Sequence, residues 1–277
     1  ASNYGVQCDE IELFNGGSSA IFTLFKHLAL DSCTIYSPAY LEYKKASLNF
    51  GYKLNLINRF ENIDVEVKKN SLVIFVNPST PDGKYYDLEE LMQKWMENSC
   101  TILIDESFLD FCDKPSAIKY LENYDKLYIL KSMTKFYSSA GIRVGTIVST
   151  KENIEKLKEF EPMWKLSQFD SIYLQNALED KVFKSISIKI NEKNRIELEN
   201  ILKSSTLVEE ISTSSANYIL VKLKDIKAKE FQERLKPYKI MVRDCSNFDY
   251  LDDRFVRIAV KSSSANDSLK RALNHIC

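Results

Sequence analysis

Short runs of apolar residues alternate with longer amphipathic segments along the first 150 residues or so of the chain. The short runs are rich in β-branched and aromatic residues, which favour strands, and the segments between them repeat their apolar positions at the spacing of a helix. The predicted strands are 11–14, 34–36, 72–76, 101–105, 127–130 and 142–149. The predicted helices are 18–30, 40–50 and 87–98. This alternation predicts an α/β fold, in which helices cover a mostly parallel sheet.

The pattern changes at about residue 151, where long and highly charged helical segments begin. The predicted helices of this half are 151–161, 167–203, 226–236 and 264–275. The predicted strands are 217–223, 239–243 and 255–260. We interpret this half as a smaller α+β domain, with a large domain over residues 1–165 and the small domain over 166–277. No stretch rich in Gly, Pro or Ser separates the two, so a long helix is expected to join them.

Composition narrows the classes of protein to consider. Apolar residues make up 44% of the 277 and charged residues 28%, which is ordinary for a folded protein. The formal net charge is −1 and the lysines are scattered, so we expect neither a nucleic acid nor a membrane as partner. No apolar run reaches the length of about eighteen residues that a membrane-spanning helix needs. The expected partner is a small molecule.

Histidine and cysteine content bears on metal sites and on cellular compartment. The chain has 2 His and 6 Cys, with no Cys-x-x-Cys pair and no metal-ligand spacing, so we expect no metal site and no His-based catalytic triad. The cysteines, several of them in apolar runs, are typical of reduced thiols, which predicts a cytoplasmic protein. They are Cys8, Cys33, Cys100, Cys112, Cys245 and Cys277.

Polar residues follow most of the predicted strands at the point where each strand ends. In open α/β sheets, ligands bind beyond the carboxyl ends of the strands, so these tails are the candidate site. The tails are Asn15-Gly16-Gly17-Ser18-Ser19, Ser37-Pro38-Ala39-Tyr40, Asn77-Pro78-Ser79-Thr80-Pro81, Asp105-Glu106-Ser107-Phe108 and Ser132-Met133-Thr134-Lys135.

Three of these tails carry side chains with definite chemistry. The Gly-Gly-Ser-Ser turn at 16–19 precedes a predicted helix and suits a phosphate, although a plain helix cap would use the same residues. Asp105 ends a strand and needs water or a cation as partner, or serves as an ordinary loop charge. Lys135 becomes a usable amine nucleophile if its pocket lowers its pKa. Taken together, these parts are what an aldehyde cofactor requires.

The motifs also occur in a recognisable order. They are Asn15-Gly16-Gly17-Ser18-Ser19, Pro38-Ala39-Tyr40, Asn77-Pro78, Asp105-Glu106-Ser107-Phe108, Ser132-Met133-Thr134-Lys135 with Arg143, and Arg257-Ile258-Ala259-Val260. This series resembles the aspartate-aminotransferase superfamily of enzymes that use pyridoxal 5′-phosphate (PLP), of fold type I, from about residue 11 to the C-terminus. The resemblance implies PLP as cofactor, a three-layer α/β/α large domain and a cytoplasmic homodimer.

The resemblance implies roles around the PLP ring. Lys135 would form the Schiff base and later move a proton at the substrate carbon, while Asp105 would keep the ring nitrogen protonated. Asn77 would hydrogen-bond the ring hydroxyl, and Tyr40 would stack on one face of the ring. Phe108 stands where aminotransferases usually have Tyr, so the hydroxyl that bonds the ring oxygen is absent.

Further roles concern the anionic groups of cofactor and substrate. Arg257 would bind the substrate carboxylate, and Arg243 would bind a second anionic group such as a phosphate. The residues implied to hold the cofactor phosphate are Gly17, Ser18, Ser132, Thr134 and Arg143.

Within the superfamily, the chain is most similar to L-threonine-O-3-phosphate decarboxylase and to histidinol-phosphate aminotransferase. Stretches such as 105–111, 134–137 and 240–247 favour the decarboxylase, so we expect a lyase that acts on L-threonine or L-serine phosphate. An aminotransferase of the histidinol-phosphate type is the first alternative. A PLP-binding protein with impaired catalysis is the second. Trp164 is expected to be a packing residue, or to line the cofactor pocket if the decarboxylase likeness holds.

Two departures from the family pattern stand out. The loop Asn77-Pro78-Ser79-Thr80-Pro81-Asp82-Gly83 replaces the usual Asn-Pro-Asn-Asn-Pro-Thr-Gly. Family members also carry several tens of residues before the first glycine motif, as an arm that covers the active site and helps form the dimer. We expect that this arm was removed or left out of the numbering, or that the protein is a shortened relative with an incomplete substrate pocket.

Overall fold

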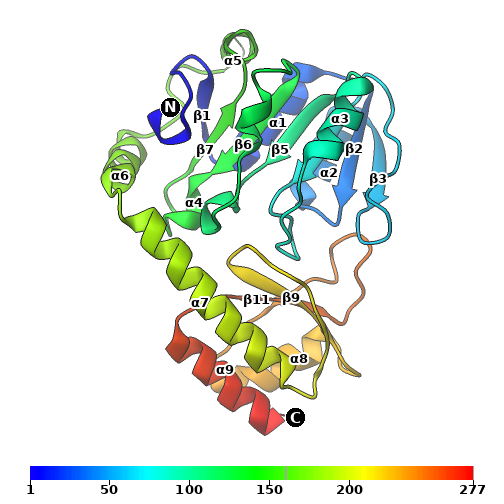
Figure 1. Cartoon of the computed structure of the whole chain (residues 1–277), viewed down its shortest axis with the longest axis vertical. Helices are drawn as coiled ribbons and strands as arrows, with labels where there is room; N and C mark the ends of the chain where they lie inside the picture. The colour runs from blue at the N-terminus through cyan, green and yellow to red at the C-terminus, as the bar shows by residue number, and fades with distance from the viewer. Residues whose placement is uncertain (160, 277) are drawn as a thin grey trace.

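The computed structural model describes residues 1–159 and 161–276 and arranges them around two β-sheets (Figure 1). The larger sheet has the strand order β1-β7-β6-β5-β4-β2-β3. Strand β7 runs antiparallel to both of its neighbours, and the strands from β6 to β3 are parallel, which confirms the predicted mostly parallel sheet. The strands are β1 (Ile11–Asn15), β2 (Ser32–Ser37), β3 (Lys53–Asn58), β4 (Leu72–Val76), β5 (Thr101–Asp105), β6 (Leu127–Ser132) and β7 (Val144–Val148).

Helices cover both faces of the larger sheet because its central strands are apolar on both sides. In β4, Ile74 belongs to the core cluster under α1, α2 and α5, whereas Val73 and Phe75 belong to the cluster under α3. This alternation follows the two-residue period of a strand. The helices are α1 (Gly17–Leu28), α2 (Leu41–Asn49), α3 (Glu89–Glu97), α4 (Met133–Phe136), α5 (Lys151–Lys158) and α6 (Gln168–Glu179).

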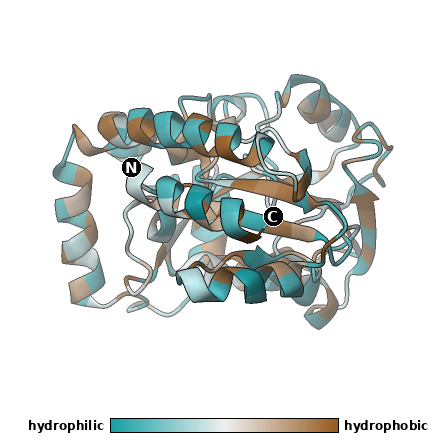
Figure 2. Cartoon of the chain, turned by 90° about the horizontal axis from the view of Figure 1, so that it is seen from below, coloured by the Kyte–Doolittle hydropathy of each residue, from teal (hydrophilic) through white to brown (hydrophobic). Residues whose placement is uncertain are grey.

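The smaller sheet has the strand order β10-β11-β9-β8 and is antiparallel throughout. The long helix α7 runs from the larger sheet to this one and packs with α8 and α9 on an apolar core (Figure 1). Figure 2 shows these central strands largely in brown, with much teal on the surrounding helices. The elements are α7 (Phe183–Lys203), β8 (Val208–Ile211), β9 (Tyr218–Leu223), α8 (Ala228–Leu235), β10 (Arg243–Asp244), β11 (Phe255–Ala259) and α9 (Ser263–Ile276).

Short 3₁₀ helices complete the connections. They are η1 (Ser2–Tyr4), η2 (Leu109–Phe111), η3 (Ala117–Tyr120) and η4 (Lys236–Tyr238). The α/β fold with a smaller α+β part is as predicted. We propose that the boundary between the two parts lies near residue 165, as the sequence pattern indicates.

Two predicted elements of the second half were wrong. The helix expected over 167–203 is interrupted, because the Asp180 carboxylate accepts hydrogen bonds from the backbone N–H groups of Val182 and Phe183 and starts a new helix there. The strand expected over 239–243 is limited to Arg243–Asp244, because Lys239 follows η4 in the left-handed conformation, with φ 58°.

The structure also bears on membrane-spanning helices, metal sites and cysteines among the described residues. Over 1–159 and 161–276, no helix combines the length and the apolar character needed to cross a membrane. Within the same ranges, no group of three His, Cys, Asp or Glu residues is placed to hold a metal ion. Five cysteines are free thiols, and Cys277 lies outside the described residues. Burial raises the pKa of the Cys112 thiol to about 12 and that of Cys245 to about 11.

Candidate active site

A cavity of about 350 Å³ lies between the strand ends of the larger sheet and the strands β10 and β11 of the smaller sheet. Eleven of the twelve residues predicted for the site line this cavity. They are Gly17, Ser18, Tyr40, Asp105, Phe108, Ser132, Thr134, Lys135, Arg143, Arg243 and Arg257. Asn77 is the one that does not line it.

One end of the cavity is built to receive an anion. Helix α1 begins at Gly17, and no side chain of the described residues caps its first amides. Gly16 has φ 84°, and a Cβ on this residue would lie only 2.8 Å from Nη2 of Arg143. Glycine at this position therefore lets the guanidinium approach the helix N-terminus, where backbone N–H groups and positive charge converge.

Hydroxyl groups surround the same end of the cavity. The Ser132 and Thr134 hydroxyls are 3.0 Å apart, and the Ser18 hydroxyl is 3.2 Å from that of Tyr40. Each hydroxyl can either donate or accept a hydrogen bond, so this group can adjust to the oxygens of a phosphate.

Asp105 ends β5 as a buried carboxylate with two neutral donors. Its Oδ2 accepts a 2.7 Å hydrogen bond from the Tyr43 hydroxyl, and its Oδ1 accepts a 2.8 Å bond from the Ser107 backbone N–H. Burial and the neighbouring Asp105 raise the pKa of Tyr43 well above its usual value, so the phenol stays protonated and keeps donating. Among residues 1–159 and 161–276, none forms an ion pair with Asp105, which leaves the carboxylate available to a cationic ligand atom.

Lys135, on the short helix α4, presents its amine to the cavity. Its Nζ lies 5.2 Å from the centroid of the Phe108 ring. The protein surrounds this amine on most sides although the open cavity leaves it accessible to solvent. Desolvation lowers the pKa of Lys135, Asp105 opposes that change, and the positive charges of Arg143 and Arg257 add to it. A lysine with a lowered pKa carries more of the neutral amine that attacks a carbonyl.

Two arginines face the cavity from the smaller sheet. Arg243 and Arg257 are directly opposite each other in the antiparallel register of β10 and β11, so both side chains leave the same face. Nη1 of Arg257 donates a 3.1 Å hydrogen bond to the Thr80 hydroxyl, and its guanidinium lies 4.6 Å from the centroid of the Tyr218 ring. These contacts leave other N–H groups of Arg257 available for a ligand.

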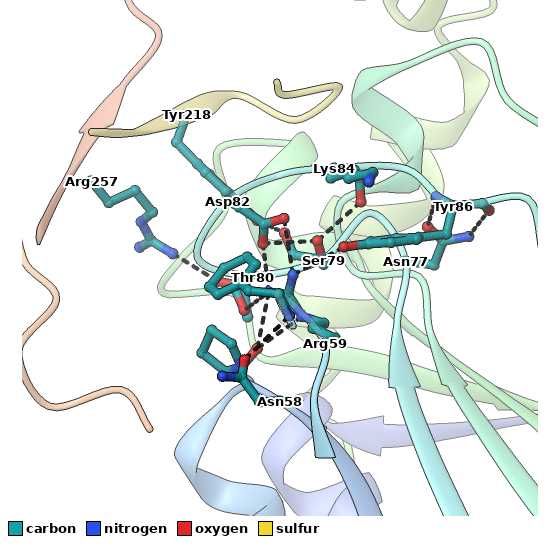
Figure 3. Close-up of polar contacts among 12 residues, drawn as sticks. Asn58, Arg59, Asn77, Ser79, Thr80, Asp82, Lys84, Tyr86, Tyr218 and Arg257 are labelled. Atoms are coloured by element: carbon teal, nitrogen blue, oxygen red, sulfur yellow. Dashed lines mark hydrogen bonds and ion pairs between the residues drawn. The ribbon is translucent and has the colours of Figure 1, made fainter. Parts of the chain in front are cut away.

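Asn77 lies behind the cavity wall, where the backbone of Tyr86 binds both ends of its amide (Figure 3). Its Nδ2 donates to the Tyr86 carbonyl at 3.0 Å, and its Oδ1 accepts from the Tyr86 N–H at 2.9 Å. The contact predicted between Asn77 and the ring hydroxyl of PLP stays a prediction.

Three residues that shape the site had no role predicted from the sequence. Tyr43 contacts Asp105, Thr80 contacts Arg257, and the Tyr218 ring lies under the same arginine. Tyr43 follows Tyr40 by one helical turn, which was a usable signal. The position of Tyr218 depends on how the two sheets meet, and no local pattern indicates that.

The residues present fit PLP, because its phosphate, its ring nitrogen and its aldehyde each have a chemical partner in the cavity. The helix N-terminus with Arg143 suits the phosphate, the carboxylate of Asp105 suits a protonated ring nitrogen, and the amine of Lys135 suits the aldehyde.

Comparisons with known proteins agree on the family. A family model described as aminotransferase class I and II matches residues 7–276. A putative threonine-phosphate decarboxylase from Caldanaerobacter subterraneus subsp. tengcongensis is 30% identical over 291 residues, covering 99% of this chain and 78% of the relative.

Solved structures show the same fold. The histidinol-phosphate aminotransferase from Clostridium acetobutylicum has a TM-score of 0.86 at 28% identity, covering 96% of this chain and 83% of that one. The histidinol-phosphate aminotransferase from Sinorhizobium meliloti, solved in complex with pyridoxal-5′-phosphate, has a TM-score of 0.82 at 17% identity, covering 100% of this chain and 78% of that one.

Proposed function

This chain belongs to the aminotransferase class I and II family, and from that premise we propose that it decarboxylates a small phosphorylated amino acid such as L-threonine or L-serine phosphate. It is an enzyme of the PLP-dependent type, and its cofactor is PLP. Decarboxylation and the phosphorylated amino-acid substrate are the proposed parts.

The observation that carries the proposal is the pairing of Arg243 with Arg257 across β10 and β11 on the cavity wall. Two guanidinium groups on one face suit a substrate with two anionic groups, each bound through charge-assisted hydrogen bonds. Threonine phosphate carries a carboxylate and a phosphate. Histidinol phosphate carries a phosphate but no carboxylate, and would leave one arginine without an anion. The 30% identical relative described as a threonine-phosphate decarboxylase supports the same choice.

The roles of the residues follow from their positions. When bound, PLP supplies a conjugated ring that accepts the electrons of a bond broken at the substrate α-carbon. Lys135 would bind the cofactor aldehyde and, once the substrate amine displaces it, would hold a proton for that carbon. Asp105, oriented by Tyr43 and the Ser107 N–H, would keep the ring nitrogen protonated. The two arginines would orient the substrate carboxylate and thereby select which α-carbon bond breaks.

Transamination is the second candidate, supported by the 28% identical histidinol-phosphate aminotransferase structure. An amino donor with two carboxylates would also satisfy both arginines. If the carbon–hydrogen bond of the substrate were the one oriented for cleavage, Lys135 would take up that proton.

Product analysis tests the proposal. The purified protein is loaded with PLP and incubated with O-phospho-L-threonine, and the products are identified by mass spectrometry and CO₂ release. The proposal expects CO₂ and the corresponding amine phosphate, with no product from the Lys135→Ala variant. Formation of a keto acid from an amino donor would contradict the decarboxylase and support the aminotransferase. Bound PLP without turnover on any phosphoamino acid or amino donor would indicate impaired catalysis.

We also propose that the protein forms a homodimer. Met163, Trp164 and Phe169 are 86%, 91% and 71% exposed, which is unusual for large apolar side chains that lie close together in the chain. Within one chain Trp164 does not line the cavity and packs against no core of the described residues, so neither role predicted for it is met there. Sedimentation that gives a stable monomer at micromolar concentration would contradict the dimer.

A further inference from the structure

We propose that the buried ion pair between Arg59 and Asp82 is a positioning device for substrate recognition, which holds Arg257 in place to receive the substrate carboxylate. The proposal deepens the proposed function and rests on Arg257 as the carboxylate-binding residue. Arg59 and Asp82 do not line the cavity themselves, so they would act only through other residues.

The pair is a bidentate fork in the interior. Nη2 of Arg59 lies 2.5 Å from Oδ1 of Asp82, and Nη1 lies 3.0 Å from Oδ2. Both side chains are only 2% exposed. Two parallel hydrogen bonds between planar groups fix orientation as well as distance.

Arg59 also donates hydrogen bonds to the backbone of two loops that reach the cavity. Its Nε and Nη2 donate to the carbonyl of Pro38 at 3.3 and 3.1 Å, and Nη2 also donates to the carbonyl of Thr80 at 3.1 Å. Pro38 is two residues before Tyr40, which lines the cavity, and Thr80 lines it directly. One guanidinium therefore connects both loops, and Figure 3 shows it between Asp82 and Thr80.

Asp82 continues the network toward the smaller sheet. Its Oδ1 accepts a 2.8 Å hydrogen bond from the Ser79 hydroxyl, and the Ser79 carbonyl accepts a 2.9 Å bond from the Tyr218 hydroxyl. The Tyr218 ring lies 4.6 Å from the Arg257 guanidinium, and Thr80 accepts the hydrogen bond from Arg257. The loop that the ion pair anchors thus contacts Arg257 directly through Thr80, and it acts on Arg257 indirectly through Tyr218 of β9.

Stability alone does not account for such a pair. Removing two charges from water is costly, and a buried ion pair replaced by apolar residues of similar volume often leaves a protein equally stable. The Arg59–Asp82 pair keeps two loops and Arg257 in fixed positions, and this role in substrate recognition accounts for the buried charges.

A second buried ion pair provides the matched comparison. Nζ of Lys131 lies 2.5 Å from Oε2 of Glu106, with side chains 5% and 2% exposed. Glu106 also accepts hydrogen bonds from the Ser116 hydroxyl and the Ala117 N–H. These contacts lead away from the arginines, and neither Lys131 nor Glu106 lines the cavity.

The experiment compares Asp82→Asn with Glu106→Gln, because each replaces a buried carboxylate by an amide of the same shape. The PLP-loaded proteins are titrated with O-phospho-L-threonine and with the matching amine phosphate, which lacks the carboxylate, and binding is followed through the visible absorbance. For Asp82→Asn we expect about 10-fold to 100-fold weaker binding of O-phosphothreonine, as for an ångström-scale misplacement. Binding of the amine phosphate and of PLP stays unchanged, and Glu106→Gln changes neither ligand.

An unchanged preference for the carboxylate in Asp82→Asn would overturn the inference, and so would an equal loss of binding in Glu106→Gln. A wild type without any carboxylate preference overturns it too. A wild type that prefers the carboxylate but releases no CO₂ contradicts the proposed function and leaves the inference standing. If Asp82→Asn does not fold, Tyr218→Phe is used, since it removes the hydroxyl that donates to the Ser79 carbonyl and leaves the ring under Arg257. It should weaken carboxylate binding in the same direction, and an unchanged affinity would overturn the inference.

Discussion

The hydroxyl of Tyr43 donates a 2.7 Å hydrogen bond to the carboxylate of Asp105, and the tyrosine that does so is completely buried. The bond connects helix α2 to the end of strand β5, two elements that neighbour each other only in the folded chain. Asp105 thereby has an oriented carboxylate before any ligand arrives, which is how a site avoids reorganisation during the reaction.

We predict that Tyr43→Phe lowers kcat/KM by about 10-fold to 100-fold, because a hydrogen bond to a charged group contributes about 1.5–3 kcal/mol. The protein should still bind PLP through its other contacts. The control is Tyr36→Phe, which also removes a buried tyrosine hydroxyl, here one that accepts a 3.1 Å bond from the Trp95 indole outside the cavity. Equal kinetic losses in the two variants, measured at a temperature where both are folded, would contradict the prediction.

A second prediction concerns Gly16, whose φ of 84° and closeness to Arg143 exclude a side chain. Gly16→Ala should cost about 1–2 kcal/mol of unfolding free energy from the backbone alone, and should also weaken PLP binding by displacing the guanidinium. Gly51→Ala is the matched control, because Gly51 has φ 75° but open space around it. Thermal unfolding should show lower stability for both variants, whereas titration with PLP should show weaker binding only for Gly16→Ala. Normal PLP affinity in Gly16→Ala would count against the phosphate role.

The fold was predictable where strands are buried on both faces. The bounds of β4 and β5 match the predicted 72–76 and 101–105, because each is a continuous apolar run between polar breakers. Strands β3 and β8 were missed because they lie at sheet edges and are only partly buried. Exposed and half-buried positions alternate along most of β3, and the two middle residues of β8 are exposed, so neither strand is a continuous apolar run.

The site was predictable where a functional residue directly follows a strand in the sequence. Gly17, Asp105 and Lys135 each follow a strand, and the parallel sheet brings those ends to one edge. Residues that act through a contact between distant segments were not predictable in this way. Arg59 is an example, since its partner Asp82 lies 23 residues further along the chain and no local period connects the two.

We predict a definite pH dependence for the capture of PLP by Lys135. Only the neutral amine attacks the aldehyde, so the rate rises with pH as the ammonium group loses its proton. Because desolvation and the nearby arginines lower the pKa of Lys135, the midpoint of this rise should fall below the value of about 10.4 for a free lysine. The rate of appearance of the visible band after adding PLP to the cofactor-free protein measures it. A midpoint at or above the free value would contradict the prediction.

The same lowered pKa has a consequence for stability. The unfolded chain binds more protons at this lysine than the folded chain between the two pKa values, so its contribution to stability rises with pH across that window. Lys135→Met in the cofactor-free protein should therefore unfold at a higher denaturant concentration at neutral pH, and this advantage should shrink as the pH approaches the unfolded value. If Lys135→Met is less stable than the wild type at neutral pH, the folded protein stabilises the charged amine and the prediction is wrong. As a check on the site of labelling, borohydride treatment with PLP should label the Lys135 peptide in the wild type only.

The last prediction separates the two arginines that face each other across β10 and β11. If Arg243 binds the phosphate of the substrate, Arg243→Met should raise KM for O-phosphothreonine by about 10-fold to 100-fold, as expected for the loss of hydrogen bonds between charged groups. The weak binding of unphosphorylated threonine should not change, because that ligand has no group for Arg243 to bind. Arg257→Met should instead weaken both ligands, since both carry the carboxylate. Arg271→Met is the control, because Arg271 lies on α9 and contacts Ser268 outside the cavity. If Arg243→Met weakens the binding of threonine and of O-phosphothreonine by the same factor, Arg243 does not bind the phosphate. The proposed substrate class then loses its structural support.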